Sequence, residues 1–390
     1  MIAARSGPEA TGDLGLYVHW PYCGRICPYC DFNVRRDRNQ TEEKARLESA
    51  ILRDLEAHAR LLKERRLVSI FLGGGTPSLM RPAFVGTLIA LAGGLWPASD
   101  DFEVTLEANP ADADRLEAFA QAGVNRLSLG VQSLNDKDLR FLGRDHDGAS
   151  ARRAARLARG LFANFSIDLI YALPAQERRA WRRSLAEAVD LGADHVSAYQ
   201  LTIEPGAAFA RRVARGSFAP ADDDLAADLF EITQEVLDSA GLLAYEVSNH
   251  ARPGRRCRHN LHCWRGGEYA GLGPGAHGRL TLGGERWASL APKRVSDYVR
   301  LLASTNFGSE RQPLTSSQAA MERLIMGLRT SEGVLSAELA PLPISASVLE
   351  RLGTPGQGLV EHRGGRLVVT GKGKLLTDRI IFELAGGGDN

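Results

Sequence analysis

Cys23-Gly-Arg-Ile-Cys27-Pro-Tyr-Cys30 follows directly on the apolar run from Leu14 to Trp20, and this stretch is the most informative part of the chain. The run predicts a strand that delivers the cysteines onto a loop, where three thiolates can converge on one inorganic centre. An iron-sulfur cluster and a structural zinc each normally take four protein ligands. Three thiolates therefore leave one metal position open to a small molecule, and we expect chemistry there.

Two other interpretations of the cysteines are a zinc site and a disulfide. His19 precedes Cys23 by four residues and could complete a Cys3His zinc site. A disulfide is disfavoured, because Met1 to Asp13 lacks the basic and apolar regions of a signal peptide and no run is long enough to cross a bilayer. We expect a cytoplasmic protein whose thiols stay reduced and available to metal.

The composition predicts a globular protein without a strong overall charge. The 390 residues, 44% of them hydrophobic, suffice for a barrel-type domain and a smaller one. The 48 basic and 47 acidic side chains give a formal charge of +1. Such a balance excludes general attraction to nucleic acid or anionic lipid, so membrane contact is expected to be peripheral at most. One local basic cluster, Arg252, Arg255, Arg256 and Arg258, precedes His259.

Short β-rich runs alternate with helical patterns up to about residue 245. The predicted strands are Leu14–His19, Leu67–Leu72, Phe102–Glu107, Asn125–Gly130, Asn164–Ile170 and His195–Tyr199. The predicted helices are Glu42–Arg66, Pro82–Leu95, Ala111–Gln121, Ala149–Leu161 and Arg178–Leu191. Six such units imply an α/β fold with a parallel sheet, either doubly wound or a partial (β/α)6 barrel.

Polar residues recur where these strands end, and this favours the barrel. The cysteines follow the first strand and Gly73-Gly74-Gly75-Thr76-Pro77 follows the second. In a barrel the carboxyl ends of the strands converge on one face, so one pocket could collect all of these groups. The polar residues at the later strands are Glu107, Asn109, Gln132, Asp168 and Tyr199.

The rest of the chain predicts a connecting region and a second small domain. A helix is expected from Asp222 to Ala240 and a strand at Leu243–Val247, followed by a loop-dominated functional region up to Gly284. From residue 315 the pattern predicts a winged-helix-like α+β module. We therefore divide the chain at 1–245, 246–314 and 315–390. The module's expected elements are Ser316–Leu328, Ala346–Arg351, Leu359–His362, Arg366–Thr370 and a final helix to Leu384.

The glycine run is the second strong signal. Glycines let the backbone approach a ligand closely, and Pro77 fixes the exit of the loop. An ordinary tight turn would have the same composition, and the run lacks the Lys-Ser/Thr ending of a nucleotide-binding P-loop. Its position one strand after the cysteines gives it weight.

With both motifs in place, the sequence closely resembles the radical S-adenosylmethionine superfamily. The resemblance implies that Cys23, Cys27 and Cys30 hold a 4Fe-4S cluster, whose fourth iron is chelated by the amino and carboxylate groups of S-adenosylmethionine. It also implies that Gly74, Gly75 and Thr76 of the glycine motif meet the methionine amino group. Tyr29 would lie near the adenine.

Within this superfamily the chain resembles the oxygen-independent coproporphyrinogen oxidase group, over essentially its whole length. The resemblance rests on Tyr17–Cys23, Ile167–Pro174, Leu201–Gly206 and Gly271–His277. It implies that Tyr17, Gly74 and Glu107 contact one S-adenosylmethionine, and that Gln132, Arg144 and Asp168 surround a second. Taken singly, Glu107 could be a paired strand-end carboxylate, Arg144 a surface charge and Asp168 a partner of a helix dipole.

Three features separate two functions within that group. The oxidase has a further cysteine where this chain has Phe32, and a long extension before the first strand, where about a dozen residues precede Leu14 here. Both differences argue against decarboxylation of coproporphyrinogen, which remains the alternative function. The third feature, His259-Asn260-Leu-His-Cys263-Trp264, resembles the His-Asn-x-x-Tyr-Trp motif of HemW-type heme chaperones, which pass heme to respiratory enzymes.

Cys263 replaces the tyrosine of that motif, so the resemblance does not imply a heme contact at this position. His259, His262 or Cys263 could each coordinate heme iron, while Asn260 and Trp264 would also contact heme. Arg255, Arg256 or Arg258 could pair with its propionates. Alternatively, His259 and Asn260 only tie down a loop over a radical enzyme with another substrate. No catalytic residue is assigned, Cys257 receives no role, and the predicted function is heme binding and transfer to respiratory proteins.

Overall fold

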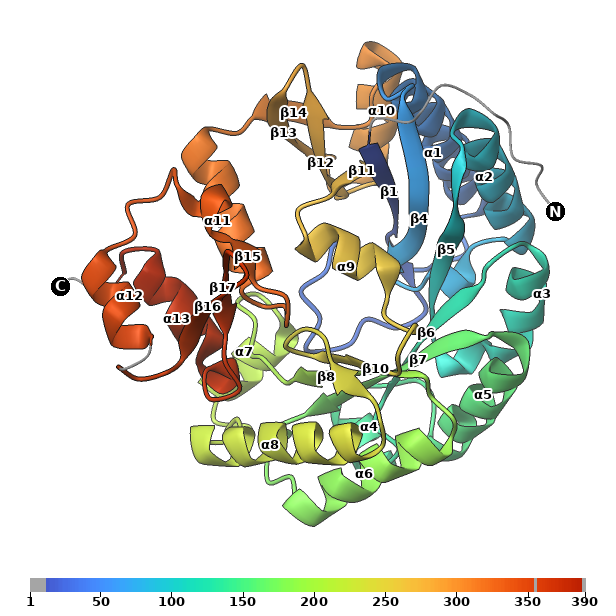
Figure 1. The fold of residues 1–390 in the computed structure, drawn as a ribbon. Coiled ribbons are helices and arrows are strands. Elements are labelled where there is room, and N and C mark those ends of the chain that lie inside the picture. The colour runs from blue at the N-terminus through green and yellow to red at the C-terminus, as the bar shows by residue number, and fades with distance from the viewer. Residues whose placement is uncertain (1–11, 354–355, 388–390) are drawn as a thin grey trace.

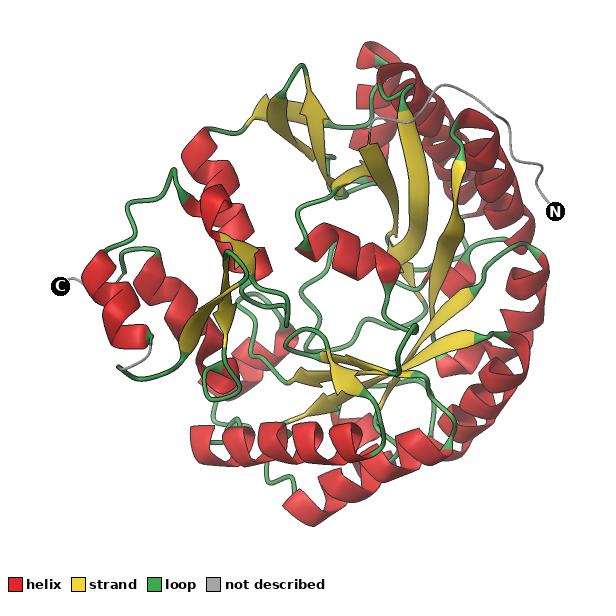
Figure 2. Cartoon of the chain, viewed as in Figure 1, coloured by secondary structure: helices red, strands yellow, loops and turns green. Residues whose placement is uncertain are grey.

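The computed structural model describes residues 12–353 and 356–387, and within them the chain forms a twelve-stranded mixed sheet and a small C-terminal sheet. The large sheet has the order β14-β13-β12-β11-β1-β4-β5-β6-β7-β8-β10-β9. It curves around the centre of the molecule, and helices cover its outer face (Figures 1 and 2). Most of Met1–Asp13, where the sequence lacks signal-peptide features, lies outside the described residues.

All six predicted strands are present and pair in parallel in chain order. Their central residues are mostly buried, and in β5 to β8 apolar residues alternate with polar ones that face the centre of the barrel. This confirms the α/β partial barrel. The strands are β1 (Gly12–Trp20), β4 (Arg65–Gly74), β5 (Ala98–Ala108), β6 (Arg126–Gln132), β7 (Asn164–Tyr171) and β8 (His195–Gln200).

The helices between these strands agree with the prediction except at certain ends. The first helix ends at Leu61 rather than Arg66, because Arg65 onwards pairs with β1 as part of β4. Residues Pro110–Arg115 form a 3-10 turn before α3, and two short helices, α4 and α7, were not predicted. The helices here are α1 (Thr41–Leu61), α2 (Pro82–Leu95), α3 (Leu116–Gln121), α4 (Asp136–Phe141), α5 (Gly148–Leu161), α6 (Arg178–Asp190), α7 (Ala208–Ala214) and α8 (Asp223–Ser239).

The prediction of a loop-dominated region after residue 247 was wrong. This segment contains α9, which carries His259, and β11, which extends the barrel sheet by pairing in parallel with β1. Its strands are short, and β10 and β11 join the sheet through β8 and β1, which lie far away in the sequence, so local periodicity did not reveal them. The elements are β9 (Leu243–Ala244), β10 (Asn249–Ala251), α9 (Arg258–Trp264), β11 (Glu268–Leu272), β12 (His277–Leu282), β13 (Glu285–Leu290), α10 (Val295–Thr305) and β14 (Glu310–Pro313).

The C-terminal residues form helices and an antiparallel sheet around a core of their own. Gly364 and Gly365 both have positive φ and turn the hairpin between β16 and β17. The first helix, α11, begins with a capping box between Thr315 and Gln318. The elements are α11 (Ser316–Gly327), β15 (Val334–Leu335), α12 (Ala346–Leu352), β16 (Val360–Arg363), β17 (Arg366–Val369) and α13 (Thr377–Leu384). No helix within the described residues is both long and apolar enough to cross a membrane.

Candidate functional site

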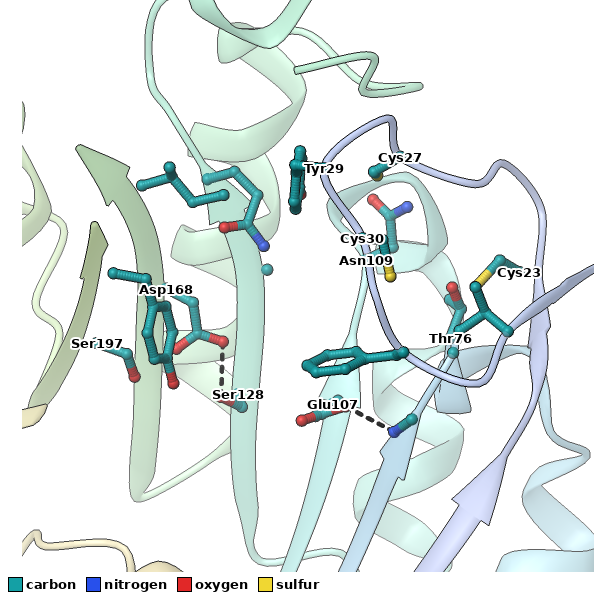
Figure 3. Close-up of a pocket in the computed structure, with 18 of the residues that line it drawn as sticks. Cys23, Cys27, Tyr29, Cys30, Thr76, Glu107, Asn109, Ser128, Asp168 and Ser197 are labelled. Atoms are coloured by element: carbon teal, nitrogen blue, oxygen red, sulfur yellow. Dashed lines mark hydrogen bonds between the residues drawn. The ribbon is translucent and has the colours of Figure 1, made fainter. Parts of the chain in front are cut away.

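A cavity of about 500 Å³ opens at the carboxyl ends of the parallel strands. Its walls bring together the cysteine loop, the glycine loop and polar side chains from the strands β5 to β8 (Figure 3). The predicted residues that line this first cavity are Cys23, Cys27, Tyr29, Cys30, Gly74, Gly75, Thr76, Glu107, Gln132, Arg144, Asp168 and Asn260.

The three cysteines of the loop are free thiols that face the same cavity. Within residues 12–353 and 356–387, no three His, Cys, Asp or Glu side chains are grouped as they would be around a single metal ion. A cluster makes a different demand, because each thiolate binds a different iron. The donor set therefore fits a 4Fe-4S cluster held by Cys23, Cys27 and Cys30.

His19 is not free to complete a zinc site with these cysteines. Its Nε2 lies 2.9 Å from the backbone oxygen of Asn33, and its Nδ1 lies 2.9 Å from the hydroxyl of Tyr17. The ring is buried and both nitrogens are engaged. The imidazole thus supports the strand end behind the cluster loop.

The glycine loop is fastened to the cysteine loop through its backbone. The amide of Gly75 donates to the oxygen of Trp20 at 2.7 Å, and that of Thr76 donates to the oxygen of Tyr22 at 2.9 Å. A Cβ on Gly75 would lie 2.7 Å from the Tyr22 oxygen and 3.0 Å from the Cys23 sulfur. Only glycine allows this close approach.

Glu107 lies across the cavity from the cysteines, and one of its oxygens accepts a hydrogen bond from the Gly74 amide at 3.1 Å. Desolvation and the nearby Asp168 raise the pKa of Glu107 to about 8, although the Gly74 hydrogen bond opposes this shift. The carboxyl group is therefore largely neutral in the empty cavity at pH 7. A cationic ligand such as a sulfonium or ammonium group would favour its ionisation.

Asp168 is surrounded by serines from three strands. It accepts hydrogen bonds from Ser128 at 2.8 Å and Ser166 at 2.9 Å, and Ser197 is a further side-chain partner. Desolvation raises the pKa of Asp168, while these hydrogen bonds and Arg126 lower it. The serines were missed in the sequence, although each lies two residues from another polar residue of its strand, namely Arg126, Asp168 or His195, and this spacing is the signal for side chains that face one side of a sheet.

Arg144 and Gln132 extend the wall beside the cluster loop. Arg144 donates to the Cys27 sulfur at 3.3 Å and to the Gly130 oxygen at 2.9 Å. The side-chain oxygen of Gln132 is enclosed and has no hydrogen-bond partner among the described residues. These residues and Asp168, expected around a second cofactor molecule, do share the cavity, and Arg144 is not a surface charge.

A second cavity of about 580 Å³ adjoins the first. Four residues of α9 line it, namely His259, Asn260, Cys263 and Trp264, and Tyr17 lies here rather than in the first cavity. The two cavities share wall residues, among them Phe71, Glu107, Tyr199 and Asn260. His262 lines neither, and its Nε2 lies 2.8 Å from the Glu268 oxygen.

His259 is held in place from two sides. Its Nδ1 lies 2.8 Å from the Ser69 hydroxyl, and its ring stacks on Phe71 with centroids 5.1 Å apart. Its Nε2 lies 3.8 Å from the Cys263 sulfur. Burial lowers the pKa of His259 to about 3, so the imidazole is neutral.

The basic cluster at the start of α9 lines neither cavity. Arg258, the first residue of α9, pairs with Asp101, and Arg256 lies 3.6 Å from Glu332. Acidic side chains thus pair with two of the arginines that the sequence offered for heme propionates. Cys257 is fully buried, with its sulfur 3.6 Å from Glu103.

Comparison with known proteins agrees with this geometry. The profile of the Radical SAM superfamily matches residues 17–188. Heme chaperone HemW of Mycobacterium tuberculosis is 38% identical over 389 residues, which cover 97% of this chain and 96% of the relative. Radical S-adenosyl methionine domain-containing protein 1, mitochondrial, of Danio rerio is 36% identical over 376 residues, 94% of this chain and 84% of the relative.

The fold also has a close match among solved structures. Coproporphyrinogen III oxidase (HemN) from Escherichia coli, a radical SAM enzyme, matches with a TM-score of 0.79 and 23% identity, covering 95% of this chain and 89% of that chain. At this identity the match supports the fold alone. The chain belongs to the radical S-adenosylmethionine superfamily, and within it to the group of relatives that includes HemW heme chaperones and the mitochondrial radical S-adenosyl methionine domain-containing protein 1.

Proposed function

We propose that this protein binds heme in the second cavity and transfers it to heme-accepting respiratory proteins. The observation that carries the proposal is the position of α9, which presents His259, Asn260, Cys263 and Trp264 to a cavity beside the predicted cluster site. Relatives similar over nearly the whole chain are heme chaperones. The volume and the aromatic walls suit a flat, largely apolar ligand.

His259 has the properties expected of an iron ligand. A neutral imidazole is a common axial ligand, and a hydrogen bond at its other nitrogen fixes its orientation. Ser69 supplies that hydrogen bond. Cys263 lies beside Nε2, so heme iron entering this cavity would meet both a nitrogen and a sulfur donor.

The first cavity would hold the 4Fe-4S cluster on Cys23, Cys27 and Cys30, and the glycine loop and Glu107 would contact S-adenosylmethionine. When both are bound, the cluster can supply an electron for reductive cleavage of the sulfonium. The positively charged guanidinium of Arg144 donates a hydrogen bond to the Cys27 sulfur. The backbone amide of Gly75 fastens the glycine loop to Trp20, at the start of the cysteine loop. We infer that the occupancy of this cavity regulates heme transfer, because both cavities share wall residues.

Heme titration of the wild type and of His259→Ala tests the proposal. Absorbance titration of anaerobically reconstituted protein should show heme binding that weakens at least tenfold in His259→Ala, because the best-oriented iron donor is lost. His262→Ala is the matched control, since its ring bonds to the Glu268 backbone and lines neither cavity. Equal heme affinities for wild type and His259→Ala would contradict the assignment of the second cavity as the heme site.

The enzymatic alternative is tested with the same preparation. Incubation with coproporphyrinogen, S-adenosylmethionine and a reductant should yield no turnover, because Phe32 stands where the oxidase has a cysteine. Formation of protoporphyrinogen over many turnovers would replace the chaperone by an oxidative decarboxylase.

A further inference from the structure

Arg126 is a buried cation whose hydrogen-bonding capacity is unused. It lies at the start of β6, is 2% exposed and lines the first cavity. Its Nε is enclosed without a partner, and no hydrogen bond joins its guanidinium to any residue of 12–353 or 356–387. The acidic group paired with it, Glu103, lies 3.8 Å from Nε, too far for a hydrogen bond.

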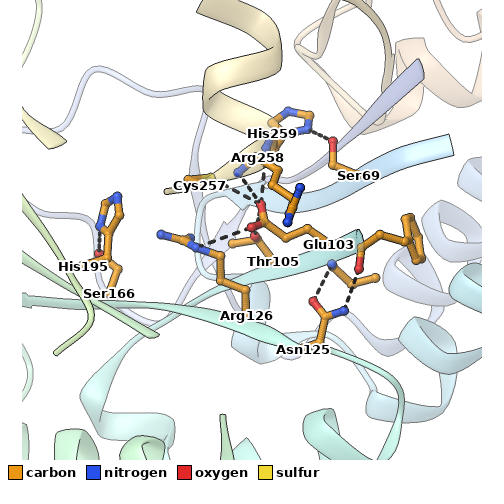
Figure 4. A network of polar contacts seen from close by, with 12 residues as sticks. Ser69, Glu103, Thr105, Asn125, Arg126, Ser166, His195, Cys257, Arg258 and His259 are labelled. Atoms are coloured by element: carbon orange, nitrogen blue, oxygen red, sulfur yellow. Dashed lines mark hydrogen bonds and ion pairs between the residues drawn. The ribbon is translucent and has the colours of Figure 1, made fainter. Parts of the chain in front are cut away.

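The carboxylates near Arg126 accept hydrogen bonds from other donors, although Glu103 does so only through Oε1, and its Oε2 is the oxygen that lies 3.8 Å from Arg126 Nε. Glu103 accepts the backbone amides of Arg258 at 3.0 Å and His259 at 3.3 Å, so it serves the first turn of α9 (Figure 4). Both oxygens of Asp168 accept from serine hydroxyls. Burying a charge without hydrogen bonds is costly, and such a group in a cavity wall calls for a partner.

Arg126 lines the first cavity, which shares wall residues with the second. Glu103 lies between its guanidinium and the backbone of His259, and Asn260, the next residue of α9, lines both cavities. A ligand in the second cavity can therefore extend past Asn260 to Arg126. The planar fork of a guanidinium matches the two oxygens of a carboxylate.

We propose that Arg126 is the carboxylate-binding residue of the joined cavities and pairs with a propionate of heme. This inference rests on the proposed function. It assigns the role of propionate partner to Arg126 in place of Arg255, Arg256 or Arg258. The carboxylate of S-adenosylmethionine is the other source of the same chemistry in the first cavity.

The test compares heme with heme dimethyl ester, in which both propionates are uncharged. Wild type should bind heme roughly tenfold to a hundredfold more tightly than the ester, as expected for a buried charge-assisted hydrogen bond. Arg126→Gln should bind both ligands with the affinity of the ester. Arg258→Gln is the control and should keep the full discrimination, because its side chain faces Asp101 outside both cavities.

Each outcome bears on a different claim. Wild type that binds heme and its ester equally well overturns the role of Arg126 and leaves heme binding intact, whereas wild type that binds neither overturns the proposed function. Should Arg126→Gln fail to fold, Arg126→Lys keeps the positive charge without the planar guanidinium. It should show a smaller preference for heme over the ester, and an unchanged preference contradicts the proposal.

Titration with S-adenosylmethionine distinguishes the two possible carboxylate partners. Arg126→Gln should bind S-adenosylmethionine within about twofold of wild type. A large loss of that affinity with an unchanged preference for heme would assign Arg126 to that cofactor instead.

Discussion

Glu107 and His259 lie on the wall of the second cavity, and the same loss of water shifts their pKa values in opposite directions. Desolvation raises the pKa of Glu107 to about 8 and lowers that of His259 to about 3. Both shifts favour the neutral form. Glu107 and His259 thus place little charge on the cavity wall at neutral pH, which suits a mostly apolar ring.

The raised pKa of Glu107 predicts a pH dependence of stability. Between about pH 4.5 and 8 the folded chain keeps a proton on Glu107 that the unfolded chain has released. The free energy of unfolding should therefore fall as the pH rises through this range, by up to about 1.4 kcal/mol per pH unit. Glu107→Gln should lack this component in urea unfolding of the apoprotein at pH 5 and pH 8.

The control for this measurement is Glu117→Gln, which changes an exposed carboxylate on α3. It should retain the wild-type slope. A slope in Glu107→Gln that equals the wild-type slope would show that another group dominates the titration.

At the scale of elements, the end of β4 depends on glycine for a geometric reason. Gly74 has a φ of +107°, and a Cβ there would lie 2.7 Å from the ring of His19. Gly74→Ala should therefore lower the free energy of unfolding by about 1–3 kcal/mol, measured by urea denaturation of the apoprotein. The strained loop would also displace the backbone amide of residue 74 from the Glu107 oxygen that accepts its hydrogen bond.

Gly94, in the last turn of α2, provides the opposite case. A Cβ there would meet nothing within 4 Å, and the residue is helical. Gly94→Ala should stabilise the protein by about 0.5–1 kcal/mol, since alanine is the better helix former. If both substitutions had the same effect, the special geometry of the glycine loop would not be the cause.

At the scale of the whole molecule, α9 is held at both ends by distant parts of the chain. Glu103 of β5 accepts amides of its first turn, and Arg323 of α11 donates to the Trp264 oxygen at its end, at 2.9 Å. Arg323 also pairs with Glu338 at 2.8 Å. The C-terminal module is therefore attached directly to the helix that lines the second cavity.

This attachment predicts that the module controls the order of α9. Arg323→Ala should lower the free energy of unfolding by about 1–3 kcal/mol and speed amide hydrogen exchange in residues 258–264. Arg329→Ala, which breaks a pair with the exposed Asp378 inside the module, should cost less than about 1 kcal/mol and leave that exchange unchanged. Equal exchange in both variants would disprove the coupling.

The local pattern was sufficient for the parallel strands and for the cysteine and glycine loops. The parallel strands are short segments rich in buried apolar residues, and their ends are marked by glycine and polar residues within a few positions. The resemblance of these two loops to the motifs of the radical S-adenosylmethionine superfamily also pointed to the family, which the comparisons then showed.

Contacts between residues far apart in the sequence determined the added strand β11, the position of α9 and the surroundings of Arg126. The register of β11 against β1, the hydrogen bond between Ser69 and His259, and the hydrogen bond from the Arg258 amide to Glu103 each join residues more than a hundred positions apart. No periodicity within a short window records such pairings, so α9 was expected to be loop and the propionate partner was sought among its neighbours in sequence. The sequence alone determined the barrel strands, the cluster loop and the family, whereas the tertiary structure determined which charges are buried without a partner, since that depends on every group packed around them.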